Sequence, residues 1–129
     1  MIYVVDAHPL VWLLQGDSRL PSGAMAILRS GDCAVIVPSI VIAEIWHLFN
    51  RRRIRISPQD IRSRILSASN CSVYPLDETV LDLLPKGLDI HDAIIVATAQ
   101  VCRDVLGQPA QLITGDRKIT ESGLIDVLW

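Results

Sequence analysis

Five short apolar runs alternate along this chain with longer segments of helical periodicity. The first run, IYVVD at 2–6, shows no polar alternation, as expected of a strand buried on both faces of a parallel sheet. The other predicted strands are CAVIV at 33–37, SVYPL at 72–76, QLIT at 111–114 and IDVLW at 125–129. Helical patterns cover 9–15, 21–30, 40–52, 58–69, 78–84 and 91–104. This alternation predicts an α/β fold with a mainly parallel sheet, whose ligands bind beyond the carboxyl ends of the strands.

The length and composition favour one compact domain over residues 1–129. Half of the residues are hydrophobic and 20% are charged, a balance that excludes a disordered chain. No apolar run reaches the roughly 18 residues needed to span a bilayer, because Asp6, Glu44 and Asp92 interrupt the most hydrophobic stretches. The segment MIYVVDAHPL also lacks the basic region of a secretory signal. We therefore expect a cytoplasmic protein without a membrane association.

Cysteine content and net charge remove further classes of function. The three cysteines, Cys33, Cys71 and Cys102, lie in apolar surroundings without CxxC spacing, which argues against a zinc site and against a disulfide framework. We expect them to be core thiols. The formal net charge of −2 gives no overall attraction to nucleic acid, so any phosphate binding must come from a local basic patch or from bound cations.

Two acidic residues interrupt apolar segments in the first half of the chain. Asp6 closes the first predicted strand, where it points into the crevice at the sheet edge or, alternatively, caps the following helix. Glu44 lies within SIVIAEIWHLF, which predicts a helix buried nearly all round and a carboxylate that faces a partner. The alternative for Glu44 is a single solvated stripe on that helix.

Two more acidic residues follow in the second half. Asp92 lies three residues after Asp89 at the start of the most apolar helix, where ordinary helix capping is the alternative explanation. Asp116 follows the fourth predicted strand in LITGD, where it is alternatively a turn aspartate. Three of the four acids therefore fall at strand ends or helix starts that face one crevice. Clustered carboxylates need cations to neutralise them, and oxygen ligands select Mg²⁺ or Mn²⁺ over zinc.

These residues, in this order, resemble the PIN-domain nucleases, and specifically the toxins of VapBC-type toxin–antitoxin pairs. The resemblance covers essentially the whole chain and is carried by YVVDAHPLVWLL, SIVIAEIWHLF, LDIHDAIIVATA and LITGDRKI. It implies that Asp6, Glu44, Asp92 and Asp116 bind metal and carry catalysis. Two positions bear on the support of this site. Ala7 replaces a frequent Thr or Ser of the family, and Asp89 stands at the place of a frequent accessory acid.

The resemblance also implies a three-layer α/β/α sandwich with a parallel five-stranded sheet. It implies a Mg²⁺- or Mn²⁺-dependent endoribonuclease that forms a homodimer and is inhibited by a cognate antitoxin. In such a mechanism the ion acidifies a water molecule and stabilises charge on the scissile phosphate, so no protein nucleophile is needed. We assign no catalytic role to His8, His47 or His91, which lack the spacing of paired metal ligands.

An acidic pocket requires positive charge nearby before it can hold RNA. The densest basic run is RRRIR at 51–55, predicted to continue the Glu44 helix, and Arg117 adds to it. We expect Arg51, Arg52, Arg53 and Arg117 to contact RNA, and the alternative is a solvated helix end that complements the macrodipole. The apolar residues Leu10, Trp12, Leu13, Leu14, Trp46 and Phe49 are expected in the core, although an antitoxin helix could dock on part of them.

Two other functions are compatible with part of this pattern. A haloacid-dehalogenase-like phosphatase also ends its first strand with an aspartate, but it needs a second aspartate where this chain has His8. A non-catalytic PIN-like scaffold would retain the fold alone, and the presence of all four acids argues against it.

Overall fold

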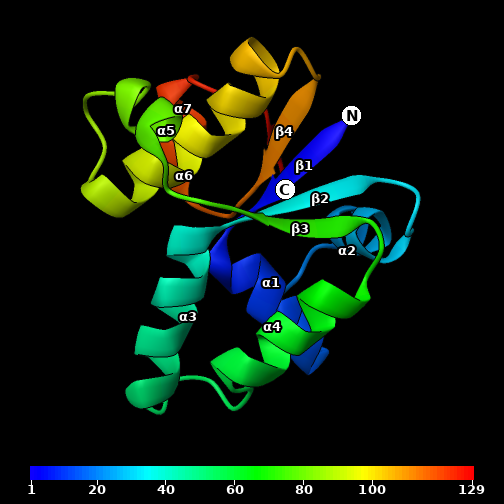
Figure 1. Ribbon diagram of the computed structural model, residues 1–129. Helices are drawn as coiled ribbons and strands as arrows, with labels where there is room; N and C mark the ends of the chain where they lie inside the picture. Colours follow the sequence, from blue (N-terminus) through cyan, green and yellow to red (C-terminus); the bar gives the residue numbers. More distant parts are fainter.

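A five-stranded parallel sheet forms the centre of the computed structural model, which describes residues 1–129 (Figure 1). The strands are β1 (Ile2–Val5), β2 (Ala34–Pro38), β3 (Cys71–Tyr74), β4 (Ala110–Ile113) and β5 (Val127–Leu128). Their order is β3-β2-β1-β4-β5, and every neighbouring pair is parallel. As predicted from Pro75, β3 ends before the proline and lies at an edge of the sheet.

Helices cover both faces of this sheet (Figure 1). One layer contains α1 (Ala7–Gln15), α2 (Ser22–Arg29), α3 (Ser39–Asn50) and α4 (Pro58–Ser67). The opposite layer contains α5 (Glu78–Asp82), α6 (Ile90–Gln100) and α7 (Arg117–Ser122), and a π-helical turn, η1 (Val101–Val105), extends α6. The three-layer α/β/α sandwich is therefore confirmed. None of these helices is both long enough and apolar enough to cross a bilayer.

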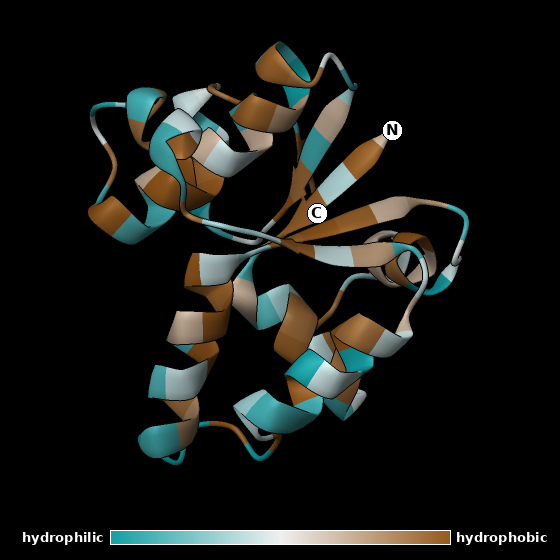
Figure 2. Cartoon of the chain, viewed as in Figure 1, coloured by the Kyte–Doolittle hydropathy of each residue, from teal (hydrophilic) through white to brown (hydrophobic).

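The core lies between the sheet and each helix layer. Hydrophobic residues are concentrated in the strands and in the helix surfaces that face them (Figure 2). The central strand β1 contributes Val4 and Val5, both fully buried, and α6 is buried continuously from Ala93 to Ala99. Ala99 packs in the main core with the strands, whereas Ala97 packs with Val80 of α5 in a smaller cluster on the other side of α6. Tight packing on both sides thus fixes the strand end and the helix start that carry Asp6 and Asp92.

The strand register places three chain segments level at the carboxyl edge of the sheet. Val5 of β1 pairs with Ile113 of β4, and Ile113 pairs in turn with Leu128 of β5. The residues that directly follow these partners are Asp6, Thr114 and Trp129. Because adjacent parallel strands lie about 4.8 Å apart, these three residues are neighbours in space.

The environment of α3 differs from the prediction. Only Val41 and Ile45 are buried in this helix, and Trp46 is 58% exposed, so the prediction of a helix buried nearly all round was wrong. The expected core position of Trp46 was wrong for the same reason. Because α3 lies in an outer layer against α1 and α4, two fully buried residues are enough to anchor it, with Ile40 and Ile42 partly buried beside them and Trp46 facing outward.

One helix end and one short helix also depart from the sequence prediction. The RRRIR segment does not continue α3, which ends at Asn50, and Arg52 has a left-handed backbone with φ 55° that turns the chain. Helix α7 was not predicted, because six residues are too few to show helical periodicity. Its start is capped by Asp116 and it ends at Gly123, whose φ of 65° suits a residue without a side chain.

Candidate active site

Asp6 lies at the junction of β1 and α1 and is oriented by two hydrogen bonds. Its Oδ1 accepts a hydrogen bond from the Ala7 backbone N–H at 2.7 Å, which makes Asp6 the N-cap of α1. Its Oδ2 accepts a hydrogen bond from the Thr114 hydroxyl, also at 2.7 Å. A carboxylate has about four acceptor positions, so these two bonds leave Asp6 able to bind a cation as well. The capping alternative and the ligand prediction are therefore compatible.

Thr114 supplies the hydroxyl that Ala7 does not. It is fully buried at the end of β4, and its Oγ1 donates to Asp6 while accepting the Asp116 backbone N–H at 3.1 Å. Asp116 in turn accepts the Ile119 N–H at 3.1 Å and caps α7. One threonine therefore connects two of the predicted site residues, and Asp116 is both a cap and a candidate ligand.

The start of α6 presents Asp92 toward the same edge. Asp89 is the N-cap of this helix and accepts a hydrogen bond from the Asp92 backbone N–H at 3.0 Å. This hydrogen bond is the main reason why the pKa of Asp89 is lowered. Asp89 is exposed, whereas Asp92 is half-buried one turn further along. The structure thus gives Asp89 a capping role that fixes the helix start, in agreement with the capping alternative inferred from the sequence.

Glu44 reaches the site from α3 in the opposite helix layer. Its side chain is 22% exposed, and its Oε1 lies 3.4 Å from Nδ1 of His91, one residue before Asp92. Ile45 next to it is fully buried, so the helix is held firmly at this point. Glu44 lies on a half-buried side of α3, which is partly open to solvent as the alternative prediction had it. The same side of the helix faces the other acids.

The pKa shifts show that the acids share one negative field. Burial, followed by repulsion from Asp6, Asp92 and Asp89, raises the pKa of Glu44 to about 7. Burial, followed by repulsion from Asp116, Asp89 and Asp6, raises the pKa of Asp92 to about 6. Carboxylates perturbed by burial and by specific charged neighbours are typical of functional sites. Residues from β1, α3, α6 and the β4–α7 junction therefore converge at the carboxyl edge of the sheet.

The donor set fits a hard divalent cation in its chemistry. All four acids offer oxygen, the ligand that Mg²⁺ and Mn²⁺ prefer, and their mutual repulsion would be relieved by a cation. No group of three or more His, Cys, Asp or Glu side chains is arranged to hold an ion simultaneously. Asp6, Glu44, Asp92 and Asp116 therefore remain the ligands predicted from the sequence, and an ion would have to draw their side chains closer together.

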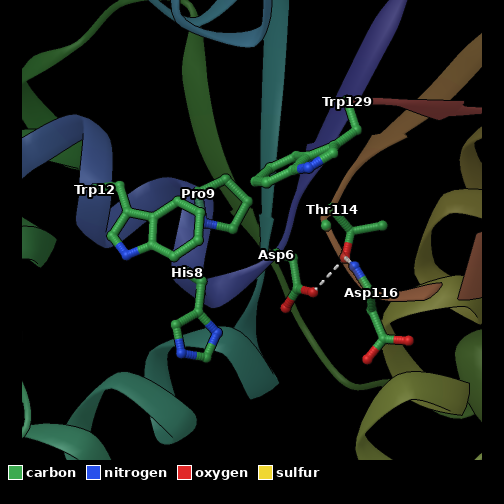
Figure 3. A pocket seen from close by; sticks show the side chains of 8 residues that line it. Asp6, His8, Pro9, Trp12, Thr114, Asp116 and Trp129 are labelled. Atoms are coloured by element: carbon green, nitrogen blue, oxygen red, sulfur yellow. Dashed lines mark hydrogen bonds between the residues drawn. The ribbon is translucent and has the colours of Figure 1, made fainter. Parts of the chain in front are cut away.

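A hollow of about 330 Å³ opens beside Asp6 and Asp116, and aromatic side chains line it (Figure 3). Besides the two acids and Thr114 it is lined by His8, Pro9, Trp12, Gly115 and Trp129. Sequence reasoning assigned Trp12 to the core and gave Trp129 no role. The signal for Trp129 was its position as the last residue of the fifth predicted strand, which puts it level with the acids only once the strand order is known.

The predicted RNA-contacting arginines are all exposed, and none of them forms an ion pair. Arg51 and Arg53 line a second hollow with His47 and Leu48, beyond the end of α3. Arg117 begins α7 directly after Asp116 and so stands at the rim of the acidic edge. Their charges are free to attract an anion.

Fold and site together define an α/β protein with a carboxylate site at the carboxyl edge of a parallel sheet. The chain belongs to the PIN domain family, which it matches over residues 3–122. Members of this family are generally nucleases and generally depend on divalent metal ions. The family match confirms the resemblance seen in the sequence and disfavours a haloacid-dehalogenase-like phosphatase.

Several solved structures share the fold. A chain of VapBC2 from Rickettsia felis, bound to a DNA fragment from their promoter, superposes with a TM-score of 0.67 at 14% identity, covering 100% of this chain and 99% of that one. A chain of a toxin–antitoxin complex from Klebsiella pneumoniae superposes with a TM-score of 0.65 at 20% identity, covering 98% of this chain and 96% of that one. A chain of VapBC-1 from nontypeable Haemophilus influenzae superposes with a TM-score of 0.61 at 18% identity, covering 99% of this chain and 97% of that one. No curated protein sequence matches the chain.

Proposed function

We propose that this chain is a metal-dependent endoribonuclease and the toxin of a toxin–antitoxin pair, folded as a single domain over residues 1–129. The observation that carries the proposal is the proximity of Asp6, Glu44, Asp92 and Asp116, since burial and, after it, repulsion from the other acids raise the pKa of Glu44 and Asp92. Membership of a family whose members are generally nucleases supports the same activity. The oxygen ligands at the acidic edge suit Mg²⁺ or Mn²⁺ and support it as well.

The residues of the chain orient the site before any ligand binds. When bound, a divalent ion supplies acidification of water and neutralisation of charge at the scissile phosphate. The Thr114 hydroxyl fixes the orientation of the Asp6 carboxylate, and the Asp89 cap fixes the first turn that carries Asp92. Asp116 is fixed by its bond to the Ile119 N–H. These bonds fix the backbone positions and the Asp6 carboxylate, whereas the four acidic side chains still have to close around the ion, because no three of them are arranged to hold one.

The substrate proposed here is RNA, attracted by exposed cations around the acidic edge. Arg117 at the rim and Arg51, Arg52 and Arg53 beyond α3 provide positive charge that no carboxylate of the chain neutralises. Such charges bind phosphate and make the affinity depend on salt. The arginines therefore offset the repulsion between RNA and the acids.

The partner proposed here is a cognate antitoxin, with a homodimer as the toxin assembly and the cytoplasm as its location. The support is the shared fold with chains of VapBC and toxin–antitoxin complexes. A non-catalytic PIN scaffold is the remaining alternative, and it requires no intact acidic set.

The test is cleavage of single-stranded RNA by the purified protein, measured with Mg²⁺, with Mn²⁺ and with EDTA. We expect cleavage with either ion and none with EDTA, and activity should return when metal is added back. Asp92→Asn should lower kcat/KM by at least about 100-fold, because one ligand charge is lost. The matched control is Asp82→Asn, at an exposed acid on α5 outside the site. Cleavage that persists in EDTA would remove the metal from the proposal, and failure to cleave any RNA would favour the scaffold.

A further inference from the structure

Three aromatic rings, those of His8, Trp12 and Trp129, contact one another at inclined angles beside the acidic site. The Trp12 and Trp129 ring centroids are 5.8 Å apart with planes inclined at 46°, and the His8 and Trp12 centroids are 5.7 Å apart with planes at 52°. Figure 3 shows His8 and Trp12 to the left of Asp6, Trp129 above it and Asp116 to its right. Two of the three tryptophans of the chain, Trp12 and Trp129, therefore lie next to the carboxylates.

Each tryptophan of this group is fixed from one side and open on another. The Trp129 indole packs so closely on Gly115 that a Cβ at that position would lie 2.6 Å from its Cζ2, yet the residue is 46% exposed. The Arg19 guanidinium carbon lies 4.8 Å from the Trp12 ring centroid, a cation–π contact. Arg19 is itself held by Asp17 at 2.7 Å. The rings are thus preorganised, although packing does not cover them.

Hollows on either side of these rings connect the acids to positive charge. The first, of about 330 Å³, runs from Asp6 and Asp116 to His8 and Trp12. The second, of about 190 Å³, shares His8 and Trp12 and is lined further along by Arg19 and Arg53. A path that carries carboxylates, then aromatic rings, then guanidinium groups matches the alternation of phosphates and bases along a nucleic acid strand.

We propose that Trp129 and Trp12 form a stacking platform for an unpaired base of the RNA, next to the phosphodiester held at the acidic edge. This inference rests on the proposed function and adds the residues that would hold the base next to the scissile phosphodiester. Aromatic side chains stack on any exposed base, whereas a duplex keeps its bases stacked inside the helix. Arg53, which forms no ion pair, contacts the phosphate beyond that base, and Arg19 holds the Trp12 ring in place.

The experiment measures tryptophan fluorescence on the full chain in a Trp46→Phe background, so that only Trp12 and Trp129 emit. The probe is a mixed-sequence single-stranded RNA of about 8 nucleotides, titrated in EDTA so that a metal-dependent activity cannot consume it. We expect saturable quenching by the single strand and little by the same RNA in a duplex. Trp129→Leu should weaken the Kd by about 10-fold, and Trp129→Phe should restore most of the affinity.

Two further variants separate stacking from loss of structure. Gly115→Ala keeps every aromatic ring but displaces the Trp129 indole, so it should weaken the Kd as Trp129→Leu does while the melting temperature confirms folding. Leu66→Ala, at a 73% exposed side chain on α4, is the matched surface control and should bind like the parent. Equal affinity of Trp129→Leu and parent, or equal affinity for duplex and single strand, would overturn the platform.

The two proposals fail in different measurements. If the binding results are as expected but no RNA is cleaved with any metal, the platform stands and the nuclease is rejected. If RNA is cleaved but Trp129→Leu leaves KM and the preference for single strands unchanged, the nuclease stands and the platform is rejected.

Discussion

The Thr114 hydroxyl donates a 2.7 Å hydrogen bond to the Asp6 carboxylate, joining residues that lie 108 positions apart in the chain. The two residues follow paired positions on β1 and β4, so the bond is set by the strand register. Because Thr114 also accepts the Asp116 N–H, it couples the orientation of two acids from different segments. A single buried hydroxyl therefore positions half of the candidate ligand set.

Removal of that hydroxyl should lower activity without removing any acid. We expect Thr114→Val to lower kcat/KM for RNA by about 10- to 100-fold, as loss of a residue that orients metal ligands commonly does. Thr114→Ser keeps the hydroxyl and should remain within a few-fold of the parent. The check is steady-state cleavage alongside a metal titration. If Thr114→Val bound metal and cleaved RNA like the parent, the hydroxyl would have no positioning role.

The stability of the metal-free protein should fall as the pH rises. The folded pKa of Glu44, about 7, lies above its ordinary 4.5, and that of Asp92, about 6, lies above 3.8, so the folded state holds more protons than the unfolded state in this range. The stabilisation is complete below the ordinary values and is lost as the pH rises through the folded ones. With EDTA present, we expect the melting temperature to be several degrees lower at about pH 8 than at about pH 5, since 1 kcal/mol corresponds to roughly 4 °C here. A flat or rising melting temperature between these values would contradict the shared negative field.

Neutralising Glu44 should stabilise the metal-free chain and weaken its stabilisation by Mg²⁺. Glu44→Gln keeps the shape of the side chain but removes one charge repelled by Asp6 and Asp92. Its melting temperature in EDTA at about pH 8 should exceed that of the parent by a few degrees, whereas stabilisation by added Mg²⁺ should be smaller than in the parent. Thermal unfolding with and without Mg²⁺ measures both effects. The exposed Glu78→Gln on α5 is the control and should change neither.

The arginines beyond α3 should determine how RNA affinity depends on salt. Substitution of Arg51, Arg52 and Arg53 with Gln should weaken binding and reduce the slope of log K against log salt by about 0.7 for each phosphate that is no longer neutralised. Binding of a single-stranded RNA at several salt concentrations gives the slope. Arg29→Gln, at an exposed position on α2, should leave it unchanged. A parent-like slope in the triple variant would remove these residues from the RNA site.

Local sequence was enough to predict a mainly parallel α/β fold and the position of the acids along it, whereas the three-layer sandwich was implied by the family resemblance. Asp6 at a strand end and Asp92 at a helix start are identified by signals within a few residues, namely the β-branched run before Asp6 and the Asp89 cap before Asp92. The same signals failed for α3, because an apolar sequence does not reveal how much of a helix the rest of the fold will cover. Helix α7 was too short for its periodicity to be seen.

By itself, then, the sequence determined the alternation of strands and helices and the carboxylates that end or begin them. The tertiary structure alone decided that Thr114 bonds to Asp6 and that Trp129 meets Trp12 beside the acids. These contacts depend on β1, β4 and β5 being neighbours with Val5, Ile113 and Leu128 in register. Strand order and register arise from packing between segments far apart in the chain, and the periodicity of any one segment carries no information about them.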